Sequence, residues 1–156
     1  MIIQRLSSFL AVLALSLPFL GVQAAEPAAA PDPTAAFKTV DLKALVPQSR
    51  MDPGQRAIFN PVRVRFTARL AAPPQAQKTA YLDRALDMLQ ISTKPKVSQR
   101  IGLDYGGEKL LAAYVEEGAA ARIAKELKVG DSRDFYAYHV YNNQFGPALV
   151  VISFGQ

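Results

Sequence analysis

Three arginines in one short stretch are the residues of this chain best suited to bind a charged ligand. Arg63, Arg65 and Arg69 alternate with apolar residues, so a strand over residues 62–70 would place their guanidinium groups on one face. Guanidinium groups bind phosphate or carboxylate groups through paired hydrogen bonds. The pattern is therefore consistent with a surface for an anionic ligand.

The same pattern also has a purely structural interpretation, which is the commoner one in proteins. An antiparallel sheet often exposes one face to water, and charges on that face keep it solvated and block unwanted edge pairing. If a second strand, expected at residues 97–103, pairs with the first, Arg100 joins the arginines and Asp104 becomes a candidate ion-pair partner. The sequence leaves both interpretations open.

Aromatic residues gather in another expected strand, at residues 131–141. If Phe135 and Ala137 point into the core, Tyr136 and Tyr138 lie outside beside the arginines and offer flat faces for bases or sugars. In the opposite register the two tyrosines belong to the core, because aromatic residues also pack well on a pleated sheet. We expect the outward arrangement.

His139 is the only histidine, and the chain contains no cysteine. A catalytic or metal-binding histidine needs partner groups, and the sequence offers no second histidine, no thiolate and no G-x-S-x-G nucleophile motif. Phosphate-binding loops, dinucleotide fingerprints and calcium loops are also absent from it. We therefore expect no enzymatic activity, no cofactor and no metal site, with an envelope hydrolase acting through His139 as the catalytic alternative.

The first 24 residues have the pattern of an export signal. Arg5 precedes an apolar run over residues 9–22, and Val22 and Ala24 provide the small residues that signal peptidase requires before its cleavage site. The run is shorter than the roughly 20 residues that span a bilayer and contains Pro18, which disfavours a retained anchor. We expect cleavage after Ala24 and a location in the bacterial periplasm.

Removal of this segment changes the composition. The full chain has 156 residues, of which 50% are hydrophobic, and a net charge of +5; without Arg5 the charge is +4. So mild a charge does not by itself indicate a nucleic-acid-binding protein, and no other apolar stretch is long enough to span a membrane after cleavage. A domain of this size buries enough surface to fold without disulfides.

The mature chain divides into three parts. Residues 25–36 are rich in alanine and proline, which predicts an extended tether. Residues 37–60 show a mixed pattern with the turn signal Asp52-Pro53-Gly54, and we expect them to be irregular. Residues 61–156 are expected to form the folded domain.

Within this domain the hydrophobic period alternates between that of strands and that of helices. The first strand should end at Pro73-Pro74, and Gly106 and Gly107 should form a tight hairpin turn. The expected elements are strands at residues 62–70, 97–103, 109–115, 131–141 and 148–154, a helix at residues 77–91 and a second helix at residues 117–127 that is closed by Gly130.

This order of elements resembles the oligonucleotide/oligosaccharide-binding fold, the OB-fold, over about residues 60–155. The resemblance is one of element order and involves no diagnostic motif. It implies a mainly β (α+β) domain, in which a five-stranded antiparallel barrel has a helix between strands 3 and 4 and an outer face that often binds oligomers. The helix between strands 1 and 2 is extra to that fold. An open antiparallel sheet with two packed helices is the alternative.

We expect the function of an exported, non-catalytic binding module of the cell envelope. Its expected partner is another envelope protein, contacted through the outer strand surface or the hairpin that carries Phe145. The alternative ligand is an anionic polymer, such as single-stranded nucleic acid or an acidic glycan. The candidate binding residues are Arg63, Arg65, Arg69, Arg100, Tyr136, Tyr138 and His139.

Overall fold

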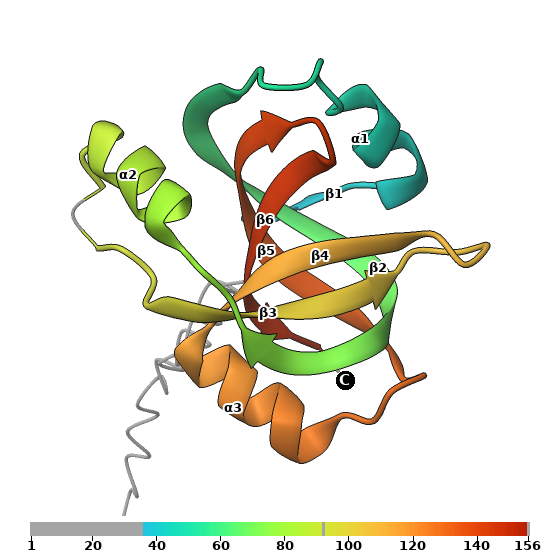
Figure 1. Cartoon of the computed structure of the whole chain (residues 1–156). Coiled ribbons are helices and arrows are strands. Elements are labelled where there is room, and N and C mark those ends of the chain that lie inside the picture. The colour runs from blue at the N-terminus through green and yellow to red at the C-terminus, as the bar shows by residue number, and fades with distance from the viewer. Residues whose placement is uncertain (1–35, 92, 156) are drawn as a thin grey trace, which may run out of the picture. The chain divides into compact units, whose positions relative to one another are not determined.

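A computed structural model describes residues 36–91 and 93–155 of the chain. These residues belong to one compact unit and are mainly β, with six strands in one sheet and three helices (Figure 1). The predicted export signal, residues 1–24, lies outside the described residues, as does the predicted tether except for Ala36. Within the described ranges, no helix is long and apolar enough to cross a membrane.

The strands and helices follow the order that the hydrophobic periods predict, preceded by a short strand and a short helix. They are β1 (Lys38–Thr39), α1 (Leu42–Gln48), β2 (Ala57–Ala76), α2 (Ala80–Met88), β3 (Val97–Asp104), β4 (Leu110–Glu116), α3 (Glu117–Glu126), β5 (Ser132–Asn143) and β6 (Gly146–Phe154). β1 and α1 lie in the segment that we expected to be irregular. α1 forms there because the Asp41 side chain accepts a hydrogen bond from the Lys43 amide, at 2.9 Å, which caps the first turn.

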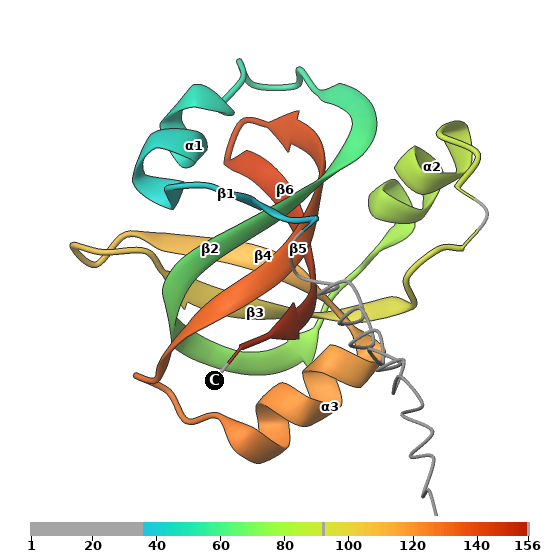
Figure 2. The ribbon, with the colours of Figure 1, turned by 180° about the vertical axis from the view of Figure 1, so that it is seen from behind.

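The strands pair in the order β1-β2-β3-β4-β6-β5, and β2 also pairs with β5. The β1–β2 and β4–β6 pairs are parallel and the other pairs are antiparallel. Hydrogen bonding therefore runs from β2 through β3, β4, β6 and β5 back to β2. Figure 2 shows β2 and β5 side by side at the back of the molecule.

β2 is longer than predicted because its prolines lie at irregular points of the pairing. Pro61 falls in a register shift against β5, and Pro73 and Pro74 fall in a register shift against β3. A bulge takes residues out of the ladder, so the missing proline N–H groups break no pairing. The prediction that Pro73-Pro74 ends the strand is therefore wrong: β2 continues through Ala76 and pairs with β3.

The main core lies between the strands. The predicted alternation of β2 places Val64, Phe66, Ala68 and Leu70 inside, each no more than 4% exposed. Val62 was expected on the same face but is 44% exposed, because it directly follows the irregular pairing around Pro61. α3 packs against this core at one end, at the bottom of Figure 1, and α1 packs against it at the top.

A second, smaller core lies on the outer side of β5 and β6, where α2 covers them (left side of Figure 1). α2 contributes Leu82, Ala85 and Leu86, all of them buried. Leu149 of β6 belongs to the main core, whereas its neighbour Val150 belongs to the second core. Both faces of β6 are thus covered, as its continuous apolar run predicts.

The turns differ in part from the sequence expectation. Gly106 and Gly107 take the positive φ angles, +112° and +67°, that the predicted hairpin requires. The loop expected over residues 142–147 is only the two-residue turn Gln144–Phe145, because β5 and β6 pair up to that turn. Gly130 has a φ of +99°, but it lies in the turn that leads into β5 and does not cap α3.

Candidate functional site

The predicted arginine and tyrosine face is formed by β2 and β5. Arg63 lies directly opposite Tyr138, and Arg65 lies opposite Tyr136. Directly opposed residues of an antiparallel pair share one face of the sheet. Ala137, between the two tyrosines, is fully buried in the main core, so the tyrosines point away from that core. The sheet therefore has the outward register.

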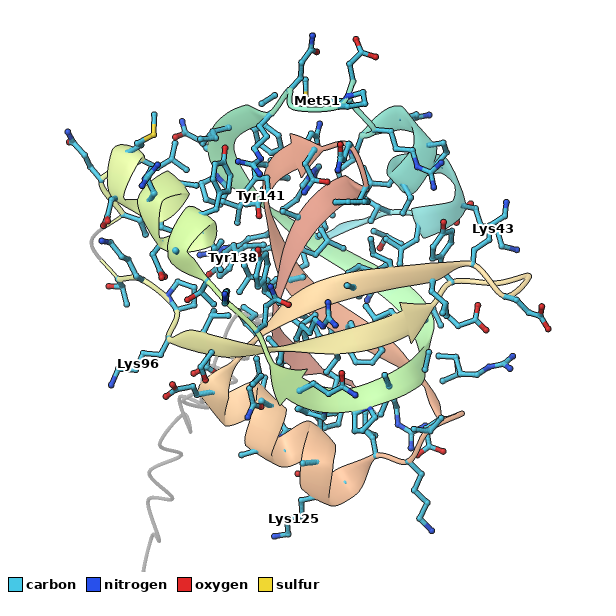
Figure 3. The ribbon with its side chains drawn as sticks, in the orientation of Figure 1. Lys43, Met51, Lys96, Lys125, Tyr138 and Tyr141 are labelled. Carbon is cyan, nitrogen blue, oxygen red and sulfur yellow. The ribbon has the colours of Figure 1, made fainter. Side chains whose placement is uncertain are left out.

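Neighbouring elements cover much of this face. Nη2 of Arg65 donates a hydrogen bond to Oγ1 of Thr39 in β1, at 3.0 Å. The ring of Phe37 meets Tyr136 edge-on, with ring centroids 5.3 Å apart. Tyr138 packs against the second core, beside α2 (Figure 3). A large part of the predicted ligand surface is thus a packing surface.

The remaining arginines of the predicted site are not brought together. Arg63 and Tyr138 line a small cleft of about 270 Å³ beside α2. Arg69 lies opposite Asp104 of β3, whereas Arg100 lies opposite Gln75, six positions further along β2. Along β3, Arg100 is four residues from Asp104, so at about 3.3 Å per strand residue it is displaced by roughly 13 Å along the sheet from the position opposite Arg69. Asp104 is therefore a neighbour of Arg69, not of Arg100.

His139 is a packing residue in this structure. It is 8% exposed, its ring meets Phe59 edge-on at 4.8 Å, and its Nε2 lies 2.7 Å from Oδ1 of Asn142. Burial lowers the pKa of the imidazole, and the hydrogen bond to Asn142 opposes that effect only in part. Among residues 36–91 and 93–155, no group of three or more His, Cys, Asp or Glu side chains could hold a metal ion.

A groove of about 630 Å³ opens over β4, between α2 and the β5–β6 turn. Its walls include Arg56, from the loop before β2, and Tyr81, from the start of α2. Arg100 of β3 and residues 110–114 of β4 form another wall, and the turn that carries Phe145 closes the rim. We refer to this concavity as the groove. Figure 1 labels α2, β4 and β6, which contribute residues to its lining.

Three tyrosines form a connected cluster in the groove. The rings of Tyr81 and Tyr141 meet edge-on with centroids 5.0 Å apart, and the hydroxyl oxygens of Tyr114 and Tyr141 lie 3.1 Å apart. The guanidinium carbon of Arg56 stands 3.8 Å from the centre of the Tyr81 ring, within the range of a cation–π contact. Burial, followed by the hydrogen bond with Tyr114, raises the pKa of Tyr141, so its hydroxyl stays protonated.

The groove is basic and its rim is apolar. Arg56 and Arg100 line it, and no aspartate, glutamate or lysine does so among the residues that the structure describes. Phe145 and Leu110, which also line it, are 72% and 69% exposed. Exposed apolar side chains that gather beside polar groups mark a candidate binding surface.

The sequence singled out Arg100 and Phe145 but did not join them into one site. Arg56, Tyr81 and Tyr114 carried no signal of their own, because each comes from a different segment and meets the others only in the folded chain. When a basic and an aromatic residue from distant segments meet only in the folded protein, no fixed spacing along the sequence indicates the contact.

No protein-family model matches this chain, and no curated protein shows significant similarity to it. The role of the groove is therefore judged from its own geometry.

Proposed function

We propose that this chain is an exported, non-catalytic binding module of the bacterial cell envelope, and that the groove binds another protein. The observation that carries the proposal is the apolar rim: Phe145 and Leu110 stand more than two thirds exposed on one groove. Interfaces between proteins are commonly centred on aromatic and aliphatic anchors that are surrounded by polar groups. Export is proposed from the signal pattern in residues 1–24.

The pattern of strand pairing supports an OB-like barrel as the framework of this module. β2 pairs with both β3 and β5, β4 pairs with β6 in parallel, and α3 connects β4 to β5. OB-folds bind ligands over their second and third strands, between the first connection and the last hairpin. β3, β4, α2 and the β5–β6 turn are the corresponding elements here, and all four line the groove.

The chemistry of the groove supports binding without catalysis. General acid–base catalysis needs a group that can exchange a proton near neutral pH. The described lining residues include no carboxylate and no histidine, and burial raises the pKa of Tyr141. His139, the earlier catalytic candidate, is buried beside Phe59 and does not line the groove.

A second candidate ligand is an anionic polymer, which the two arginines and three tyrosines of the groove favour. Arginines neutralise phosphate or carboxylate groups, and tyrosine rings stack on bases or sugars. The groove suits this role better than the arginine row of β2, because β1 and α2 cover part of that row.

The protein-binding proposal is tested by photo-crosslinking in living cells, with a photoreactive amino acid at Phe145 and, as a control, at Lys125 on the exposed side of α3. We expect a discrete adduct only from position 145. The captured protein is then purified and titrated. Phe145→Ser and Leu110→Ser should each weaken binding about tenfold or more, as expected for interface anchors. Met88→Ser is the matched control, because Met88 is 67% exposed but lies outside the groove.

The polymer alternative is tested by titrating the mature protein with oligo-dT and with polygalacturonate at low and high salt. Binding that weakens steeply with salt and is lost on Arg56→Ala with Arg100→Ala, but not on Arg84→Ala, would assign the groove to a polyanion. Absence of such binding leaves the protein partner as the function.

A further inference from the structure

The second edge of β4 is incompletely paired. β4 pairs with β3 from Leu110 to Glu116, but with β6 only at Tyr114 and Val115. No other strand pairs with this edge of β4 among the residues that the structure describes. The first half of the edge, from Leu110 to Ala113, is therefore open.

The pairing pattern identifies which backbone groups are free. The amide of Tyr105 donates to the carbonyl of Lys109, at 3.1 Å, so these two residues form a hydrogen-bonded pair at the β3–β4 turn. Because such pairs alternate along an antiparallel ladder, the backbone groups of Leu111 and Ala113 point to β3. Those of Leu110 and Ala112 point to the opposite, open edge.

This open edge faces the groove. Leu111 and Ala113 are buried, whereas Leu110 and Ala112 are exposed, yet all four line the groove together with Tyr114. A groove along one face of a strand would be lined by every second residue. Lining by consecutive residues indicates that the edge of the strand forms the wall.

Pro147 of β6 disfavours further pairing along this edge. Continuing the register of Tyr114 with Val150 towards the start of both strands would bring Pro147 opposite Leu111. Proline has no N–H group to donate to a neighbouring strand. At this point, beside the β5–β6 turn, the backbone of β6 therefore has no N–H group to donate to β4.

We propose that an extended segment of a partner protein adds to the open edge of β4 as a further strand, and that this segment carries acidic side chains. The inference rests on the proposed function, because it uses the same groove. Strand addition gives affinity through backbone hydrogen bonds and specificity through alternate side chains. Arg56 and Arg100 line the groove without an acidic counterpart among its described residues, so acidic side chains complement it.

The experiment uses two synthetic peptides, acetyl-(Glu-Val)4-amide and acetyl-(Lys-Val)4-amide, and the mature protein labelled for NMR. We expect the Glu-Val peptide to bind and to slow hydrogen exchange at the amides of Leu110 and Ala112. The Lys-Val peptide should not bind. Arg100→Ala should weaken binding of the Glu-Val peptide several-fold, whereas Arg84→Ala, on α2 outside the groove, should not.

Two further tests remove backbone hydrogen bonds between the edge and the peptide. Ala112→Pro deletes the N–H group on the open edge and should weaken the Glu-Val peptide about tenfold, while Ala112→Val keeps that group and should bind normally. If Ala112→Pro does not fold, a Glu-Val peptide N-methylated on alternate residues makes the same test on the unchanged protein. The N-methylated peptide can align with β4 in two registers, and we expect it to bind less tightly than the unmethylated peptide in both.

Several outcomes would overturn the inference and leave the proposed function standing. One is a partner, captured at Phe145, that binds the groove without protecting Leu110 and Ala112 and is unaffected by Ala112→Pro. Another is protection of both amides in the dilute protein alone, since another segment of the chain would then cover the edge. Unchanged binding of the captured partner in Phe145→Ser and Leu110→Ser, together with normal edge protection, would instead count against the rim as the anchor, and so against the proposed function.

Discussion

His139 is kept neutral by its surroundings. Burial against Phe59 lowers its pKa below the ordinary value of 6.5, so the unfolded chain binds a proton at a higher pH than the folded protein does. The stability associated with the neutral imidazole is therefore complete above pH 6.5 and is lost as the pH falls towards the folded-state pKa. We predict that the melting temperature decreases between pH 7.5 and pH 5.

The matched variant is His139→Gln, which can keep a hydrogen bond to Asn142 without titrating in this range. We expect a flatter dependence of melting temperature on pH in this variant than in the natural protein. Parallel curves for the two proteins would show that other groups cause the acid sensitivity.

Two phenylalanines are expected to differ in their contribution to stability, because one is buried and the other is exposed. Phe66 is 1% exposed and stacks on Phe135 with ring centroids 6.0 Å apart, whereas Phe145 is 72% exposed. We predict that Phe66→Ala lowers the free energy of unfolding by about 3–5 kcal/mol, because a cavity remains in a packed core. Phe145→Ala should change it by less than about 0.5 kcal/mol. Urea denaturation measures both values, and a large loss in Phe145→Ala would mean that the turn packs on the molecule.

At the scale of elements, Gly102 of β3 lies close against β2. A Cβ atom at this glycine would lie 2.9 Å from the Cβ and 3.1 Å from the amide nitrogen of its partner Ala72. We predict that Gly102→Ala destabilises the protein by about 1–3 kcal/mol, because the two strands must shift apart. Combining it with Ala72→Gly should recover part of that loss, which a double-mutant cycle from urea denaturation would detect. If the losses of stability in the two single variants simply add, the contact between residues 102 and 72 is not the cause of the destabilisation.

The prolines of β2 illustrate why element boundaries are hard to predict. Alternation identified the central part of the strand, because period-two burial is a local property of an extended chain. From the local sequence, Pro73 and Pro74 predict the end of the strand. They are tolerated because the pairing with β3 is irregular around them, and that irregularity involves a strand more than twenty residues away in the sequence.

At the scale of the whole molecule, the two cores allow α2 to open separately. α2 contacts only the second core, through Leu82, Ala85 and Leu86, while the main core lies on the other side of the sheet. We predict that Leu82→Ala, at a fully buried position, selectively speeds hydrogen exchange of the α2 amides and leaves β2 and β3 protected.

Ile123→Ala is the control for this prediction, because Ile123 of α3 is equally buried but belongs to the main core. It should speed exchange throughout the domain. Uniform exchange in both variants would mean that the two cores unfold as one cooperative unit. The Leu82→Ala variant should also bind groove ligands less tightly, since Tyr81 of α2 holds its place against Tyr141.

The sequence by itself determined the order of the elements, the buried face of β2 and the glycine turn between β3 and β4, since each depends on residues close along the chain. It also predicted the arginine row on one outer face, but for the neighbouring tyrosines it left an outward and a core register open. Only the tertiary structure decided that β1 and α2 cover part of this row, that Arg100 does not join it, and that a second surface exists. The groove depends on where α2 docks and where β4 and β6 diverge, and both are set by packing between distant segments.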